Sequence, residues 1–168
     1  TTSWSSSGFS NTHVNQLTNH NMLPFIVSVA CVNGQFNGTT CFAEAWLRAT
    51  NGGQNTGAIA TYMASINQGW NPPMEGQDEA NLLLVADQVR TFGGYTYNGS
   101  CSMMDEYGSS GVTEFNCWHI FGDPSVRLRT KNATELACTH ADQIDPDAES
   151  FVIDTDCPGA LAGLSYQG

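Results

Sequence analysis

The sequence predicts an α/β fold in which a largely parallel sheet is flanked by helices. Two short apolar runs indicate buried strands: one extends from Phe25 to Ala30 and the other from Gly57 to Ser65. Runs that are short and apolar on both faces are typical of central strands covered by helices. Segments with helical spacing alternate with these runs, which is the order of an α/β layer. In such a sheet, functional groups gather in the loops that follow the carboxyl ends of the strands.

The other elements follow from local patterns, taken in chain order. Residues 1–9 are rich in Ser, Thr and Gly and have no period, which indicates a loop. Turn dipeptides such as Asn33-Gly34 end the first strand, and the segment 115–129 indicates two strands around a turn at Gly122-Asp123-Pro124. Apolar spacing is helical in four stretches: 11–17, 41–49, 78–89 and 97–107.

The pattern changes near residue 130, so we divide the chain into an α/β segment, 1–130, and a second segment, 131–168. Cys138, the Asp-rich stretch 141–149 and the alternating residues 150–154 predict short antiparallel strands, as at the opening of a β-sandwich. Too few residues follow to close a sandwich. We therefore expect the chain to be a fragment of a longer polypeptide.

The net charge of the chain argues against some classes of binding partner. The chain has 16 acidic and 5 basic residues, a formal charge of −11, which disfavours binding to nucleic acid or to anionic membranes. We expect no transmembrane segment, because no stretch approaches the ~18 apolar residues of a membrane helix. An oxidising compartment is favoured by six cysteines without zinc-binding spacing, at positions 31, 41, 101, 117, 138 and 157.

Cys31 is the first candidate for chemistry, because it follows a buried strand and precedes a glycine-containing loop. Two interpretations stay open from position alone: an inert core thiol, since free cysteines are among the most buried residue types, or a nucleophile. A nucleophilic thiol also needs a base, usually His. None of the four histidines, His13, His20, His119 and His140, stands at the end of a comparable strand.

The segment Leu23–Gly34 resembles the nucleophile segment of the gingipains, a family of bacterial cysteine peptidases with a caspase-like fold. Further stretches resemble motifs of that family in the same order: Cys41–Ala45, Ile66–Trp70, Pro73–Glu79, Thr91–Gly94 and Phe121–Ser125. The resemblance implies that residues 1–130 form the later part of a caspase-like catalytic domain. It also implies that 131–168 begin an immunoglobulin-like domain.

The same resemblance implies roles for individual residues. Cys31 is expected to be the nucleophile, and the backbone N–H groups of Cys31 and Gly34 to help form an oxyanion hole. Trp70 and Met74 match positions that wall the S1 pocket, where an aromatic face suits the stem of a cationic P1 side chain. The catalytic His, its orienting acid and the S1 acid are expected in an upstream segment of the same polypeptide, before Thr1.

A structural calcium site is a further expectation, with ligands from Gln35, Phe36 and Glu44. Gln35 stands where the family commonly has Asp, and one carboxylate is few for calcium. The alternative is that Glu44 is a plain solvated residue or acts at the start of a helix. We expect no cofactor to be required for the chemistry.

Two disulfides are expected, Cys101–Cys117 and Cys138–Cys157. Cys101 and Cys117 fall where the family has no cysteine and flank a short helix and loop. Cys138 and Cys157 lie on strands predicted to be adjacent. Cys41 matches a family cysteine and is expected to be buried and free, which leaves Cys31 unpaired.

The sequence therefore predicts a cysteine endopeptidase that cleaves protein or peptide substrates after Arg or Lys through an acyl-enzyme on Cys31. We expect it to be secreted or on the bacterial surface, where it is degradative or a specialised processing peptidase. The alternative is a catalytically silent adhesion or binding protein on the same scaffold. Without the upstream His, the isolated chain is expected to be inactive.

Overall fold

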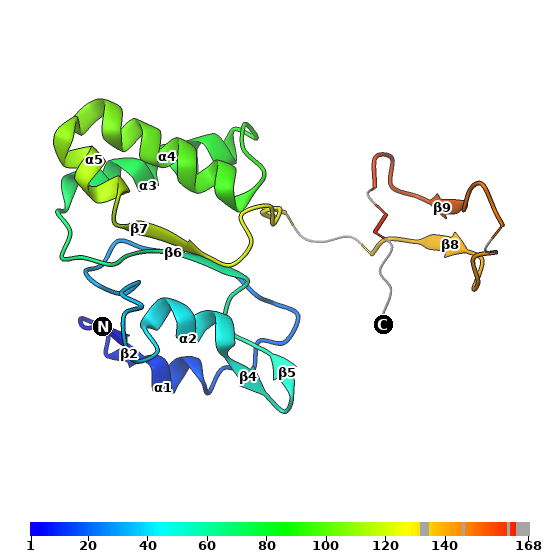
Figure 1. The fold of residues 1–168 in the computed structure, drawn as a ribbon, viewed down its shortest axis with the longest axis horizontal. Helices are drawn as coiled ribbons and strands as arrows, with labels where there is room; N and C mark the ends of the chain where they lie inside the picture. Colours follow the sequence, from blue (N-terminus) through cyan, green and yellow to red (C-terminus); the bar gives the residue numbers. More distant parts are fainter. Residues whose placement is uncertain (132–134, 146, 161, 164–168) are drawn as a thin grey trace. The chain divides into compact units, whose positions relative to one another are not determined.

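The computed structural model describes residues 1–131, 135–145, 147–160 and 162–163. These residues form two compact units, Thr1–Thr130 and Lys131–Gly168, and each unit is described by itself (Figure 1). Unit 1 contains the α/β sheet and its helices. Unit 2 contains a separate pair of strands.

The central sheet of unit 1 has three strands in the order β3 (Phe25–Ser28), β6 (Ala60–Ala64) and β7 (Trp118–Phe121). β3 and β6 are parallel, with Ser28 opposite Met63, whereas β6 and β7 are antiparallel. The prediction of buried strands near 25–30 and 57–65 is confirmed, with shorter bounds. The prediction of a largely parallel sheet is wrong for this part of the chain, because the three-stranded sheet is mixed.

The connection between β6 and β7 explains the mixed sheet. Two packed helices, α3 (Asn71–Val85) and α4 (Phe92–Tyr107), lie between these strands, followed by the short α5 (Ser109–Phe115). One crossing helix would return the chain to the opposite end of the sheet and produce a parallel strand. A pair of crossing helices returns the chain to the end that it left, so β7 must run back along β6.

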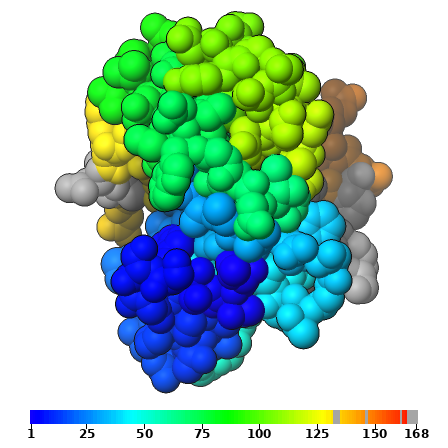
Figure 2. All heavy atoms as spheres, turned by 90° about the vertical axis from the view of Figure 1, so that its left-hand side faces the viewer, coloured from blue at the N-terminus to red at the C-terminus, as the bar shows by residue number. Residues whose placement is uncertain are grey.

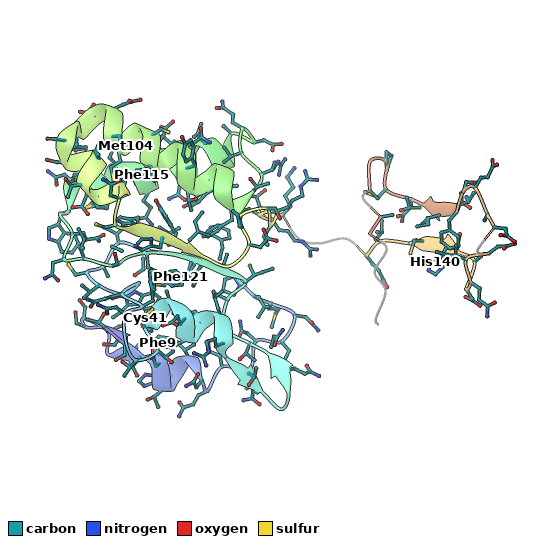
Figure 3. The ribbon with its side chains drawn as sticks, in the orientation of Figure 1. Phe9, Cys41, Met104, Phe115, Phe121 and His140 are labelled. Carbon is teal, nitrogen blue, oxygen red and sulfur yellow. The ribbon has the colours of Figure 1, made fainter. Side chains whose placement is uncertain are left out.

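Helices cover both faces of the sheet (Figure 1). α1 (Asn11–Val14) and α2 (Phe42–Arg48) lie on one face, and α3, α4 and α5 lie on the other. Cys41 and Phe9 lie on the first side, and Met104 and Phe115 on the second (Figure 3). Each face has its own apolar cluster, because successive side chains of β6 point to opposite sides. Met63 packs with the first cluster, and Ala60 and Tyr62 with the second.

Several elements differ from the sequence-based expectation. β1 (Ser3–Trp4) and β2 (Phe9–Ser10) form a small antiparallel pair within the stretch expected to be a loop. β4 (Thr50–Asn51) and β5 (Gln54–Asn55) form a hairpin beyond α2. After the turn at Gly122, the expected second strand is reduced to a single bridge between Thr91 and Arg127.

Helix starts also differ from the expected bounds. α3 begins at Asn71 rather than near Asp78, with prolines in its first turn, where a missing N–H costs nothing. α4 begins at Phe92, five residues before the expected start, because the Thr91 side chain caps it by accepting from the Gly94 N–H. Helical periodicity alone does not locate these starts, since the first turns of α3 and α4 contain Pro and Gly.

Unit 2 contains β8 (Cys138–His140) and β9 (Ile153–Thr155), which pair antiparallel with Thr139 opposite Asp154. All residues of both strands are exposed. The expectation of short antiparallel strands is met by this pair. The immunoglobulin-like continuation stays a prediction, and residues 132–134, 146, 161 and 164–168 lie outside the described part of the chain.

The contact between α3 and α4 generates a stability prediction. A Cβ at Gly99 would lie 2.2 Å from the Gly76 carbonyl oxygen and 2.9 Å from Ala80 Cβ. Gly99→Ala must therefore separate the two helices, and we expect overpacking to lower the free energy of unfolding by about 1–3 kcal/mol. Urea unfolding followed by circular dichroism measures the change.

Gly38→Ala is the matched control, since a Cβ there meets no atom within 4 Å. We expect this variant to unfold within about 0.5 kcal/mol of the wild type. Equal stability of the Gly99 and Gly38 variants would contradict the close α3–α4 contact.

Candidate active site

Cys31 lies three residues beyond the end of β3, at the carboxyl edge of the sheet, and its thiol is exposed. Its Sγ lies 3.9 Å from the Gln68 carbonyl oxygen. Cys31 lines an open cavity of about 650 Å³, together with residues from three segments: the N-terminal stretch through Ser7, the end of β3 with the following turn, and Asn67–Trp70. Figure 2 views this edge, with the first residues in dark blue and the green segment that leads into α3 above them.

The turn after Cys31 is strained and firmly held. Val32 has a φ of 53°, a left-handed conformation that is an outlier for a β-branched residue. Such a conformation persists only where surrounding contacts determine it, and the Val32 N–H donates to the Ile66 carbonyl at 2.9 Å. Asn33 is buried, and its Oδ1 accepts a bond of 2.7 Å from the Thr1 hydroxyl. These contacts fix the direction in which the Cys31 backbone presents its thiol and N–H.

The two expected oxyanion donors differ in availability. Among the described residues, no oxygen accepts a hydrogen bond from the Cys31 N–H. The Gly34 N–H, however, donates to the Ala64 carbonyl at 2.8 Å, so this structure does not support Gly34 as an oxyanion donor. A Cβ at Gly34 would lie 2.7 Å from the Met63 carbonyl oxygen. The glycine is needed for this close approach of the turn to β6.

The expected S1 residues lie at the start of α3, where Trp70 is the N-cap residue and Met74 is the fourth residue of the helix. Trp70 is 71% exposed and lines the cavity with Cys31. Met74 is 49% exposed, and its N–H donates to the Trp70 carbonyl. Met74 does not belong to the lining of this cavity. The structure therefore brings Trp70 into the site and places Met74 one helical turn further on.

Among the described residues, those that line the cavity include no histidine. His13 bonds Ser10 at the start of α1, and His140 lies in unit 2. His119 lies on β7, where its Nε2 is 3.0 Å from Ser65 Oγ, and burial lowers the pKa of its ring. A catalytic His upstream of Thr1 stays a prediction.

The expected calcium ligands do not form a strong cation site. Glu44 is at the third position of α2, and its Oε2 accepts from the Cys41 N–H at 2.8 Å as part of a capping box. Phe36 packs edge-on against His119 and Phe121, and Gln35 is exposed. Within the described ranges, no group of three or more His, Cys, Asp or Glu residues is placed to hold a metal ion. The donor set fits calcium poorly, because a single carboxylate is already engaged; the helix-start role of Glu44 is the one observed.

All six cysteines are free in this structure, so the two expected disulfides are not formed. The strand register of unit 2 places Cys138 opposite Thr155, two residues from Cys157. Cys101 lies on α4, whereas the Cys117 carbonyl is held at the sheet by the Ser65 N–H. The prediction that Cys41 is buried and free is confirmed.

Sequence reasoning missed two contributors to the site. Thr1 and the Ser-rich residues before Gly8 line the cavity, although they lack any pattern that would distinguish them from a surface loop. Glu114 on α5 is buried and accepts from the Gly69 N–H at 2.7 Å. An acidic residue in a short helix carries no signal of this contact in the sequence.

The Cys31 thiol is exposed in a strained turn beyond the carboxyl end of β3, beside an open cavity, and a reactive cysteine needs exposure of this kind. Comparison with known proteins identifies the family. Residues 1–129 match peptidase family C25, and the chain belongs to that family.

Curated relatives and solved structures extend the match. The chain is 45% identical to gingipain R2 of Porphyromonas gingivalis over 172 residues, which cover 99% of the chain and 23% of that protein. It is 44% identical to gingipain R1 of the same species, with 99% and 17% covered. It therefore spans less than a quarter of the length of these relatives.

The crystal structure of the Arg-specific cysteine proteinase gingipain R superposes with a TM-score of 0.79 at 45% identity, covering 93% of this chain and 37% of that chain. A further protease structure, 18% identical with a TM-score of 0.68, covers 92% and 39% and supports the fold alone. Among the residues that the structure describes, no helix is long and apolar enough to cross a membrane.

The difference in exposure between the Cys31 and Cys41 thiols generates a prediction on reactivity. Cys31 is exposed, whereas Cys41 is 2% exposed and burial raises the pKa of its thiol. We expect iodoacetamide to alkylate Cys31 in the native protein and to leave Cys41 unmodified until urea unfolds it, because the thiolate is the nucleophile. Peptide mapping by mass spectrometry after timed alkylation measures the order.

Alkylation with iodoacetamide in urea without reductant counts the free thiols of the chain. Six labels on the chain are expected, and each disulfide would remove two of them. Modification of Cys41 as fast as Cys31 in the native protein would contradict the burial of Cys41.

Proposed function

We propose that the protein containing this chain is a cysteine endopeptidase with Cys31 as its nucleophile. The observation that carries the proposal is the exposed Cys31 thiol at the carboxyl end of β3, facing an open cavity. The Cys31 thiol gives its proton to the catalytic base, the thiolate attacks the scissile carbonyl carbon, the peptide C–N bond breaks, and the departing amine takes that proton from the base. Water then hydrolyses the thioester, which releases the acid and restores the thiol.

The Cys31 N–H is the proposed oxyanion donor. It is fixed by the strained Val32 turn and has no acceptor among the described residues. A preorganised N–H stabilises the tetrahedral oxyanion without reorganisation during the reaction. This support applies to Cys31 and not to Gly34, whose N–H is already bonded to Ala64.

We propose that residues preceding Thr1 in the longer polypeptide supply the catalytic His. The Thr1 nitrogen lies 2.7 Å from the Val32 carbonyl oxygen, and the Thr1 side chain lines the cavity. A residue joined to Thr1 would therefore begin beside the Cys31 turn. This placement also supports the proposal that the isolated chain is inactive.

The proposed P1 residue is Arg or Lys. Trp70 offers an exposed aromatic face beside the thiol, and such a face attracts a cationic side chain and packs on its aliphatic stem. The related gingipain R is described as Arg-specific. No carboxylate is among the residues that line the cavity, so the acid that pairs with P1 is proposed to lie elsewhere in the polypeptide.

Further parts of the proposal concern the setting of the enzyme. Protein or peptide substrates follow from the peptidase family. A secreted or bacterial-surface location is proposed from the loop-rich, acidic and cysteine-rich composition. The calcium site stays a prediction, and no step above depends on it.

Active-site labelling of the full-length protein tests the nucleophile. We expect Arg- or Lys-chloromethyl ketone to alkylate the wild type at Cys31, and Cys31→Ala to abolish the labelling, because the thioether bond forms on Sγ. Mass spectrometry identifies the labelled peptide.

Cys138→Ala is the matched control, since Cys138 is also exposed but lies on β8. It should be labelled as fast as the wild type. A folded wild-type protein that neither reagent labels would instead favour the silent binding scaffold.

Trp70→Ala tests the S1 wall in the full-length protein. Loss of the aromatic face is expected to raise KM for substrates with Arg at P1 by about tenfold, the scale of a cation–π contact plus lost packing. Trp70→Phe should recover part of this loss. Steady-state kinetics with matched Arg and norleucine P1 peptides give the ratio, and equal effects on both peptides would contradict a cation-selective role.

A further inference from the structure

The loop from Ser65 to Trp70 determines much of the geometry around Cys31. The Ile66 carbonyl accepts from the Val32 N–H in the strained turn. The Gln68 carbonyl lies 3.9 Å from Cys31 Sγ. Trp70 at the end of the loop lines the cavity. A shift of this loop would therefore move the wall of the cavity relative to the thiol.

Residues at the end of α5 hold this loop at two points. At its start, the Ser65 N–H and hydroxyl both donate to the Cys117 carbonyl, at 2.8 and 3.1 Å. At its end, the Gly69 N–H donates to Glu114 Oε1 at 2.7 Å. The second point lies between Gln68, whose carbonyl oxygen is close to Cys31 Sγ, and Trp70, which lines the cavity.

Glu114 is an unusual residue for this position. Glu114 is buried, at 7% exposed, and its Oε2 has no hydrogen-bond partner among the described residues. Burying a carboxylate is costly unless its bonds compensate. A bond from an N–H to a carboxylate is shorter and stronger than a neutral one, and the 2.7 Å distance to Gly69 agrees with that.

Gly69 is matched to this contact. A Cβ at Gly69 would lie 3.3 Å from Glu114 Oε1, closer than an ordinary van der Waals contact. A larger residue would push the carboxylate away from the N–H that it holds. Gly69 in the loop and the buried Glu114 on α5 are therefore sterically complementary.

We propose that Glu114 is a positioning residue that sets substrate recognition by fixing the Gln68–Trp70 segment relative to Cys31. The proposal rests on the proposed peptidase function and adds a residue on α5 that does not line the cavity. Because Glu114 acts through the backbone, its loss should impair reaction with a P1-bearing reagent more than the intrinsic reactivity of the thiol.

Glu114→Gln and Glu114→Met in the full-length protein form the test pair. Both are close in size to Glu, but only Gln keeps an oxygen that can accept from the Gly69 N–H. The rate constant for labelling by Arg- or Lys-chloromethyl ketone is divided by the rate constant for iodoacetamide at Cys31. We expect this ratio to fall about tenfold or more in Glu114→Met and to stay within about threefold of wild type in Glu114→Gln, as for loss or retention of a bond to a buried acceptor.

Glu106→Gln and Glu106→Met are the matched controls, because Glu106 is exposed on α4. Both should leave the ratio unchanged. A Glu114→Met ratio equal to wild type would overturn the proposal, and this includes the case in which both rate constants fall by the same factor. Loss of the fold in Glu114→Met would also overturn it, because Glu114 would then be a purely structural residue.

A wild-type protein that the chloromethyl ketones do not label would remove the proposed function, and this inference with it. A labelled wild type with an unchanged Glu114→Met ratio would remove this inference alone. The two failures are therefore distinguished in the same assay.

Discussion

The parallel pairing of β3 with β6 is the interaction on which the rest of the site depends. It places the carboxyl ends of the two strands at one edge, with Ser28 opposite Met63. The chain beyond β3 then turns back against β6, where the Val32 N–H reaches Ile66 and the Gly34 N–H reaches Ala64. These backbone bonds compensate the strained Val32 conformation and leave the Cys31 thiol facing the cavity.

The second constraint is the close contact of α3 and α4. Gly76 and Gly99 let the two helices approach, and the chain returns to the edge of the sheet where β6 ends. This return produces the antiparallel β7 and also places α5 beneath the loop before Trp70. The topology that makes the sheet mixed therefore also places Glu114 where its carboxylate accepts a hydrogen bond from the Gly69 N–H.

Much of this arrangement was predictable because the signals are local. The apolar runs of β3 and β6 and the helical spacing of α2 reveal buried elements whose positions the structure confirms. The hairpin β4–β5 and the early start of α4 were missed, since two-residue strands and glycine-rich first turns carry little periodicity. The two expected disulfides are not formed in this structure, and for Cys138 the strand register, which a sequence pattern does not fix, places Thr155 opposite instead of Cys157.

The sequence by itself identified Cys31 as the candidate nucleophile, because a cysteine after a buried strand, within ordered family motifs, is a local feature of the chain. Only the tertiary structure decided which groups surround it. Gly34 was expected to donate to an oxyanion, yet its N–H is bonded to Ala64, and Glu114 was overlooked because its partner is 45 residues away. Hydrogen bonds between distant segments depend on how strands and helices are connected, and that connection is set by packing rather than by any local pattern.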